Sequence, residues 1–129
     1  MIVVDTSVWV DFRRGDPRAL PLVELLENNE ALVHPFVQGE LAMTGLGPPA
    51  EGNLASLALL PAIPVVSQAE VLAFVAHWRL QGAGIGWIDA HLAASALAFG
   101  ATLWTHDGKL GGVAERLGIA HVPGQKLGA

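Results

Sequence analysis

Five short, β-prone apolar runs alternate with helical patterns along the chain, and this alternation constrains the fold more than any other feature. The runs are Ile2–Val4, Ala31–Val33, Ile63–Val66, Ala101–Trp104 and Ile119–Val122. Strands that alternate with helices form a parallel sheet with helices on both faces. Because such strands are buried on two sides, they are apolar throughout, as these runs are. The sequence therefore predicts an α/β domain of three layers, α/β/α, with a central, mostly parallel five-stranded sheet.

Start and stop signals set the limits of the helices between these runs. Pro35 suits the first position of a helix, Ser67 and Glu70 form a capping box, and Gly100 and Gly118 are typical stops. Pro64 confines the third run to an edge of the sheet. We expect helices around residues 22–26, from Pro35 to about Thr44, from Ser67 to about Leu80, from Ile88 to Phe99, and from Leu110 to Leu117.

Length and composition narrow the class of protein. The 129 residues predict a single domain over 1–129. Only 15% of the residues are charged and 52% are hydrophobic, which excludes a disordered chain. No charge-free stretch is a mostly apolar run of about 20 residues, so we expect no membrane helix. There is no cysteine, and Asp5 directly follows the first apolar run, so we expect no signal peptide and a cytoplasmic location.

Four of the twelve acids occupy unusual positions. Asp5 directly follows the first run, and Asp107 comes three residues after the fourth. Glu40 and Asp89 lie on otherwise apolar helices. Taken singly, Asp5, Asp89 and Asp107 are each explained as helix caps, and Glu40 as an exposed glutamate on a buried helix. In open α/β sheets, however, the functional site lies at the carboxyl ends of the strands, where these four acids would meet.

Four carboxylates at one edge would repel one another and raise one another's pKa. A divalent cation relieves that repulsion, and oxygen ligands without cysteine suit Mg²⁺ or Mn²⁺. Such an ion activates water and offsets negative charge on a phosphate, which suits phosphodiester hydrolysis. The net charge of −5 points the other way, because nucleic-acid-binding proteins are usually basic.

Four segments carry a resemblance to a known family. The opening Ile2–Phe12 resembles that of PIN-domain nucleases, especially the VapC toxins of bacterial and archaeal toxin–antitoxin pairs. Gly39–Leu41, Gly84–Ala96 and Leu103–Asp107 resemble the second, third and fourth acidic motifs of that family, in its order. The resemblance spans nearly the whole chain, and its first and third motifs are the specific ones.

The resemblance implies a metal-dependent endoribonuclease that hydrolyses RNA with metal-activated water. Asp5, Glu40, Asp89 and Asp107 would be the catalytic, metal-binding quartet, with Asp5 and Asp89 as direct ligands and Asp107 able to act through water. Thr6, Ser7 and Thr105 match small polar positions that would support this site by hydrogen bonding. The implied cofactor is Mg²⁺ or Mn²⁺, and the implied partners are an RNA substrate, a cognate VapB-type antitoxin and a second copy in a homodimer.

Basic residues offer a thin surface for RNA. Arg13, Arg14 and Arg18 form one cluster, and Lys109 lies two residues from Asp107. These four are candidate RNA contacts, although a solvated turn is the better explanation of the arginines.

Two other functions fit the same residues. One is a housekeeping PIN nuclease without an antitoxin, and the other is a non-catalytic binding module that keeps the PIN fold. A phosphatase of the haloacid-dehalogenase type is disfavoured, because Asp5-Thr6-Ser7 lacks its second Asp.

Overall fold

A computed structural model describes residues 1–44, 57 and 59–124 of the chain. Its sheet consists of β1 (Ile2–Val4), β2 (Ala31–Leu32) and β3 (Thr102–Trp104), in the order β2-β1-β3. Both neighbours run parallel to β1, and Ile2 lies opposite Ala31 on one side and Thr102 on the other. The prediction of a parallel sheet is confirmed for these three strands, and β1 lies at their centre.

The prediction of five strands is wrong for the described residues. The chain does form one parallel bridge at each of the two edges, Val33 with Ala62 and Leu103 with Ala120. Ala62 directly precedes the third run, and Ala120 lies in the fifth. Prolines limit both ladders, because a proline has no N–H to donate. Pro61 occupies the next donor position before the first bridge, and Pro123 the next one after the second. The N–H of Ile119 is donated to Ala114 O, 2.9 Å away, instead of to β3.

The helices follow the predicted pattern closely. Ser67 caps α5 by accepting a hydrogen bond from Glu70 N, at 3.2 Å. Gly100 and Gly118 adopt the left-handed backbone (φ +68° and +73°) just after two of the helices, where glycine is favoured. The helical elements are α1 (Thr6–Arg13), the 3₁₀ helix η1 (Pro17–Ala19), α2 (Pro21–Glu27), α3 (Pro35–Met43), α5 (Gln68–Trp78), α6 (Trp87–Ala98) and α7 (Gly108–Arg116).

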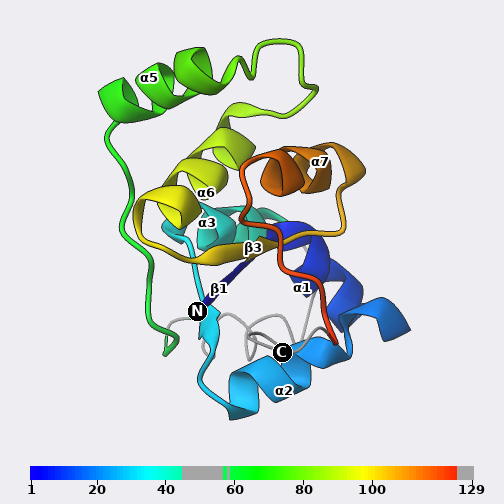
Figure 1. The fold of residues 1–129 in the computed structure, drawn as a ribbon. Helices are drawn as coiled ribbons and strands as arrows, with labels where there is room; N and C mark the ends of the chain where they lie inside the picture. Colours follow the sequence, from blue (N-terminus) through cyan, green and yellow to red (C-terminus); the bar gives the residue numbers. More distant parts are fainter. Residues whose placement is uncertain (45–56, 58, 125–129) are drawn as a thin grey trace.

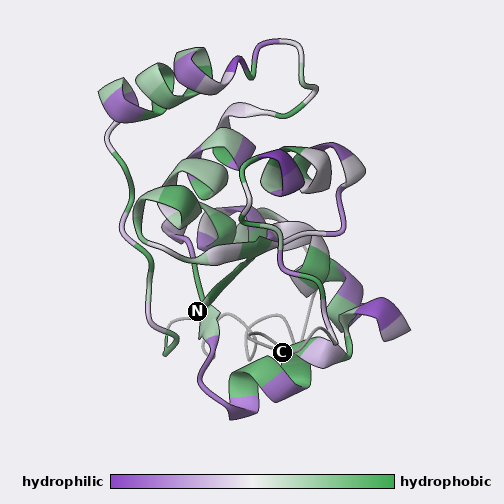
Figure 2. Ribbon diagram, in the orientation of Figure 1, coloured by the Kyte–Doolittle hydropathy of each residue, from purple (hydrophilic) through white to green (hydrophobic). Residues whose placement is uncertain are grey.

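Helices cover both faces of the sheet. Figure 1 shows α1 and α2 on one side of the strands and α6 and α7 on the other. Right-handed crossovers require this arrangement, since the chain leaves β1 in one direction for β2 and returns in the other for β3. The strands and the helix faces against them are hydrophobic, whereas hydrophilic residues lie outward (Figure 2). Val3, Val4 and Leu92 are fully buried at the centre of this core.

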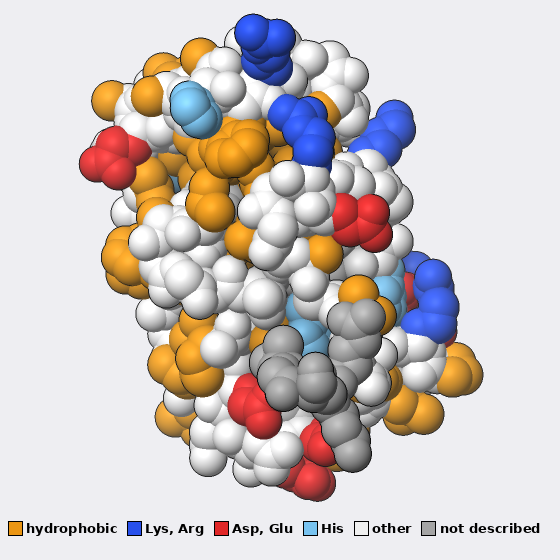
Figure 3. Space-filling view, in the orientation of Figure 1, with side chains coloured by type: hydrophobic (Ala, Val, Ile, Leu, Met, Phe, Trp, Pro, Cys, Tyr) orange, Lys and Arg blue, Asp and Glu red, His pale blue; other side chains and the backbone are white. Residues whose placement is uncertain are grey.

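Hydrophobic side chains also reach the surface around α5 and α6, as Figure 3 shows. Leu72, Trp87 and Phe99 on these helices are 53%, 43% and 54% exposed. Within the described residues, no helix is long and apolar enough to cross a membrane.

Candidate active site

Asp5 lies at the centre of a hydrogen-bonded group at the carboxyl end of β1. It is only 5% exposed, and its Oδ2 accepts hydrogen bonds from Ser7 Oγ and Thr105 Oγ1, both at 2.7 Å. Because both hydroxyl hydrogens then point at the carboxylate, the 3.2 Å between the two hydroxyl oxygens is a contact without a shared proton. Asp5 Oδ1 accepts no hydrogen bond within the described part of the chain and is available to a ligand.

Glu40 is joined to the same edge through Thr6. Thr6 Oγ1 donates to Glu40 Oε1 at 2.7 Å, linking the first turn of α1 to α3. His34 begins α3, with its Nδ1 accepting from Phe36 N at 3.0 Å, and this cap fixes where the helix starts. Thr6, Ser7 and Thr105 therefore bind the predicted acids directly, as expected for supporting residues.

Asp107 caps α7 and lies at the site at the same time. Its Oδ1 accepts from Lys109 N and Leu110 N, at 2.9 and 3.0 Å. Its own N–H donates to Thr105 Oγ1 at 3.0 Å, so the hydroxyl that supports Asp5 also anchors Asp107. The cap interpretation is correct for Asp107, and it does not exclude a role at the site.

The pKa of Asp89 is affected by the charges of the other three acids. Asp89 occupies the first turn of α6, and its Oδ2 accepts from Gly86 N at 3.4 Å. Burial, followed by the charge of Asp5 and the smaller effects of Asp107 and Glu40, raises the pKa of Asp89 to about 6, against the lowering effect of the Gly86 N–H. The charges of the other three predicted acids therefore act on Asp89, although the four come from four different elements.

The donor set suits a hard divalent cation. Among the residues that the structure describes, no three acidic or histidine side chains converge tightly enough to hold an ion on their own. Mg²⁺ does not require such a cage, because it binds through one or two carboxylates and keeps several waters. The free Oδ1 of Asp5 and the destabilised carboxylate of Asp89 fit that mode of binding.

The predicted basic residues do not all lie beside the four acids. Arg18 is bound to Asp16 (2.8 Å) and Asp11 (3.2 Å) in the turn after α1, and it lowers the pKa of Asp16 to about 2. Arg13 and Arg14 lie at the end of α1, away from its first turn. Lys109 lies in the first turn of α7, beside Asp107.

Comparisons with known proteins agree with this geometry. The sequence pattern that defines the PIN domain matches residues 2–116. Over 122 residues the chain is 45% identical to Ribonuclease VapC32 of Mycobacterium tuberculosis, in both strain CDC 1551 / Oshkosh and strain ATCC 25618 / H37Rv. That match covers 93% of this chain and 95% of the relative.

The chain belongs to the VapC group of the PIN-domain family. The fold of this PIN domain is also similar to that of PAE2754 from Pyrobaculum aerophilum, with a TM-score of 0.59 and 16% identity. That match covers 91% of this chain and 94% of the other, and it concerns the fold alone. All four acids of the site lie inside the range that the PIN pattern matches.

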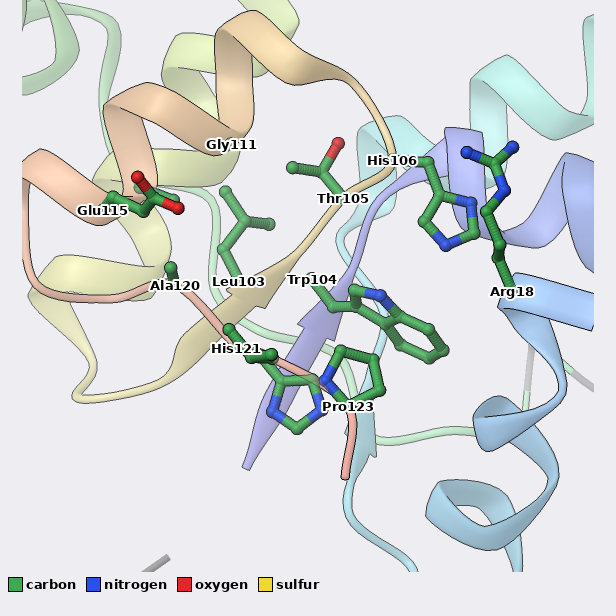
Figure 4. Close-up of a pocket in the computed structure, with 12 residues that line it drawn as sticks. Arg18, Leu103, Trp104, Thr105, His106, Gly111, Glu115, Ala120, His121 and Pro123 are labelled. Atoms are coloured by element: carbon green, nitrogen blue, oxygen red, sulfur yellow. The ribbon is translucent and has the colours of Figure 1, made fainter. Parts of the chain in front are cut away.

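Beside the acids, this PIN domain holds a histidine that joins the same hydrogen-bonded group. His106 Nδ1 lies 2.6 Å from Asp11 Oδ2, and His106 N donates to Ser7 Oγ at 2.9 Å. The ring lies at the end of a cavity of about 410 Å³, in which Trp104 separates His106 from His121 (Figure 4). Asp11 therefore lies next to the site. Its spacing of four residues from Ser7 on α1 is the signal that places both on one helix face.

Proposed function

We propose that this PIN domain is a metal-dependent endoribonuclease that uses Mg²⁺ or Mn²⁺, and that it is the toxin of a VapBC pair. The observation that carries the proposal is the half-buried carboxyl of Asp89, whose pKa is raised first by burial and further by the charges of three crowded carboxylates, those of Asp5, Asp107 and Glu40. Crowding of this kind costs stability unless a cation occupies the site. The name of the 45%-identical relative, a ribonuclease, supports RNA as the substrate.

In this proposal each side chain has a separate task. Asp5 and Asp89 hold the cation, with Asp107 and Glu40 completing the negative field around it. Ser7 and Thr105 fix the orientation of Asp5 through their hydrogen bonds to Oδ2, which leaves Oδ1 directed to the ligand. When bound, the cation supplies an acidified water and offsets negative charge on the phosphate. Asp107, with Oδ1 committed to the N-terminus of α7, has its second oxygen for solvent or substrate.

We also propose a binding site for the antitoxin. A groove of about 580 Å³ runs beside Glu40 and is lined largely by apolar side chains, among them Phe36, Met43 and Ile88. Met43 is 85% exposed, an arrangement that a covering partner would explain. An apolar VapB-type segment would fill this groove and block access to Glu40. The homodimer and the cytoplasmic location implied by the family remain parts of the same proposal.

Cleavage of total RNA by the purified, antitoxin-free protein tests the activity. We expect cleavage that needs Mg²⁺ or Mn²⁺ and that Asp89→Asn abolishes, with sequenced ends that reveal the preferred site. Glu24→Gln is the matched control, because Glu24 is an exposed carboxylate on α2 outside the site. Metal-independent cleavage, or equal activity of Asp89→Asn and Glu24→Gln, would contradict the proposal.

Isolation from the native host separates the toxin from the housekeeping alternative. A toxin should co-purify with a small partner, and Met43→Glu in the groove should release that partner without preventing cleavage. A protein that cleaves RNA but brings down no small partner would favour a nuclease that works without an antitoxin.

A further inference from the structure

The loop that joins α5 to α6 leads to Asp89 and ends at an exposed tryptophan. Trp87 is the first residue of α6 and is 43% exposed. Its ring meets that of His91, one turn further along, edge-on at 90° with 4.9 Å between centroids. His91 packs in turn against Phe36 of α3, at 4.7 Å. The indole of Trp87 is therefore held on one side by the buried ring of His91, while a large part of its surface faces outward.

A lysine lies across the same loop. A Cβ atom added at Gly84 would come within 2.6 Å of Lys109 Cδ and 3.1 Å of Lys109 Nζ, so the glycine leaves room for this side chain. Gly84 also has φ +82°, a conformation that other residues rarely adopt. Lys109 is exposed and makes no ion pair with any residue that the structure describes. The positive charge of Lys109 therefore lies over the loop at Gly84, which is three residues before Trp87.

This pairing matches the way proteins hold single-stranded nucleic acid. Such sites combine positive charge for the phosphates with aromatic rings on which unpaired bases stack. Gly84 and Trp87 are at most about 11 Å apart along the chain, so one short stretch of a strand can reach both. Trp9 and Trp104 cannot serve as the platform, because they are only 4% and 2% exposed.

We propose that Trp87 and Lys109 form a nucleotide-binding surface beside the acidic site. An unpaired base of single-stranded RNA stacks on Trp87, and a neighbouring phosphate pairs with Lys109. The inference rests on the proposed ribonuclease function and adds to it the two side chains that hold a nucleotide beside the acidic site. Bases in a duplex are already stacked on one another, so this surface discriminates against them.

Binding of a short, labelled single-stranded RNA, measured by fluorescence anisotropy with Mg²⁺, tests the surface. All variants carry Asp89→Asn, so that binding is read without cleavage. Trp87→Ala should weaken binding about five- to hundredfold, and Trp87→Phe should restore much of it. Phe99→Ala is the matched control, because Phe99 is an exposed aromatic residue at the opposite end of α6.

Salt dependence tests the lysine separately. Lys109→Ala should reduce the slope of log Kd against log salt concentration by about 0.7, the value for one phosphate contact on a single strand. Arg116→Gln is its control, because Arg116 lies in the last turn of the same helix and the amide keeps a donor for Trp78 O.

Several results would overturn the inference. One is an unchanged Kd in Trp87→Ala, another is an equal loss in Phe99→Ala, and a third is equally tight binding of a duplex of the same sequence. A change of oligomeric state in Trp87→Ala without a change in RNA affinity would assign this ring to a protein contact instead. If the wild type, with Asp89 intact, does not cleave RNA but Trp87 still governs binding, the proposed nuclease activity fails and the binding surface stands.

Discussion

Replacing Asp89 with asparagine should make the metal-free protein more stable while it abolishes activity. The pKa of Asp89 is about 6, against an ordinary 3.8, so ionising this carboxyl at neutral pH works against folding. At 1.36 kcal/mol per pKa unit the upper limit is about 3 kcal/mol, and the half-buried position of Asp89 leaves about 1 kcal/mol after solvent screening. Asparagine removes the charge and keeps an oxygen for Gly86 N.

Thermal melts of wild type and Asp89→Asn in a chelator, across pH 4 to 7, measure this effect. A gain of about 1 kcal/mol corresponds to a melting temperature higher by roughly 3–6 °C at pH 7. Because the folded-state pKa of this acid is raised, the gain should shrink as the pH falls through 6 and vanish below about 4. Glu24→Gln, outside the site, should show no such profile. A less stable Asp89→Asn, or a gain independent of pH, would refute the argument that ionising Asp89 in this half-buried, acidic position works against folding.

Three further predictions concern the supports of the site and the core. Thr105→Val removes a donor to the buried carboxylate of Asp5, and we expect a loss of about 1.5–3 kcal/mol in unfolding free energy that Thr105→Ser largely recovers. Mn²⁺ at 100 times its Kd should stabilise wild type by about 2.7 kcal/mol in thermal melts, and an equal rise in Asp5→Asn would count against the assigned ligand. Burial lowers the pKa of His34 to about 4, so its contribution to stability is present above pH 6.5 and is lost as the pH falls towards 4. His34→Asn, which keeps an acceptor for Phe36 N, should flatten that part of the pH profile of the unfolding free energy.

Most of the fold was predictable because the main strands and helices carry local signals. The runs at residues 2–4, 31–33 and 101–104 form β1, β2 and β3 almost at the predicted limits. The two edge segments were wrongly predicted to be full strands. They are as hydrophobic as strands, but they do not form the hydrogen bonds of a strand. Two of the missing bonds follow from prolines that are visible in the sequence, Pro61 and Pro123. The third bond is missing because Ile119 N donates to Ala114 O at the end of α7 instead of to β3. This depends on tertiary packing, which the local sequence does not reveal.

Part of the candidate site could likewise be predicted from the sequence, and part of it could not. The positions of Asp5 and Asp107 follow from the rule that functional groups gather at the carboxyl ends of parallel strands. The link between Asp11 and His106 could not be read from the sequence, because it depends on how α1 packs beside β3. Trp87 was also missed, since a tryptophan in an apolar helix is expected in the core and only the structure shows its exposure.

Once the site is located, the net charge of −5 indicates that the cation should bind before the RNA does. The chain has twelve acids and seven bases, and four of the acids belong to the site. Eight acids and seven bases remain, so the rest of the molecule is close to neutral. Repulsion of RNA therefore comes mainly from the site itself, and a bound cation removes it where the phosphate must approach. RNA affinity of the wild type should thus rise steeply with Mg²⁺ and that of Asp89→Asn less so, whereas an equal rise in both would mean that the cation acts only on the RNA.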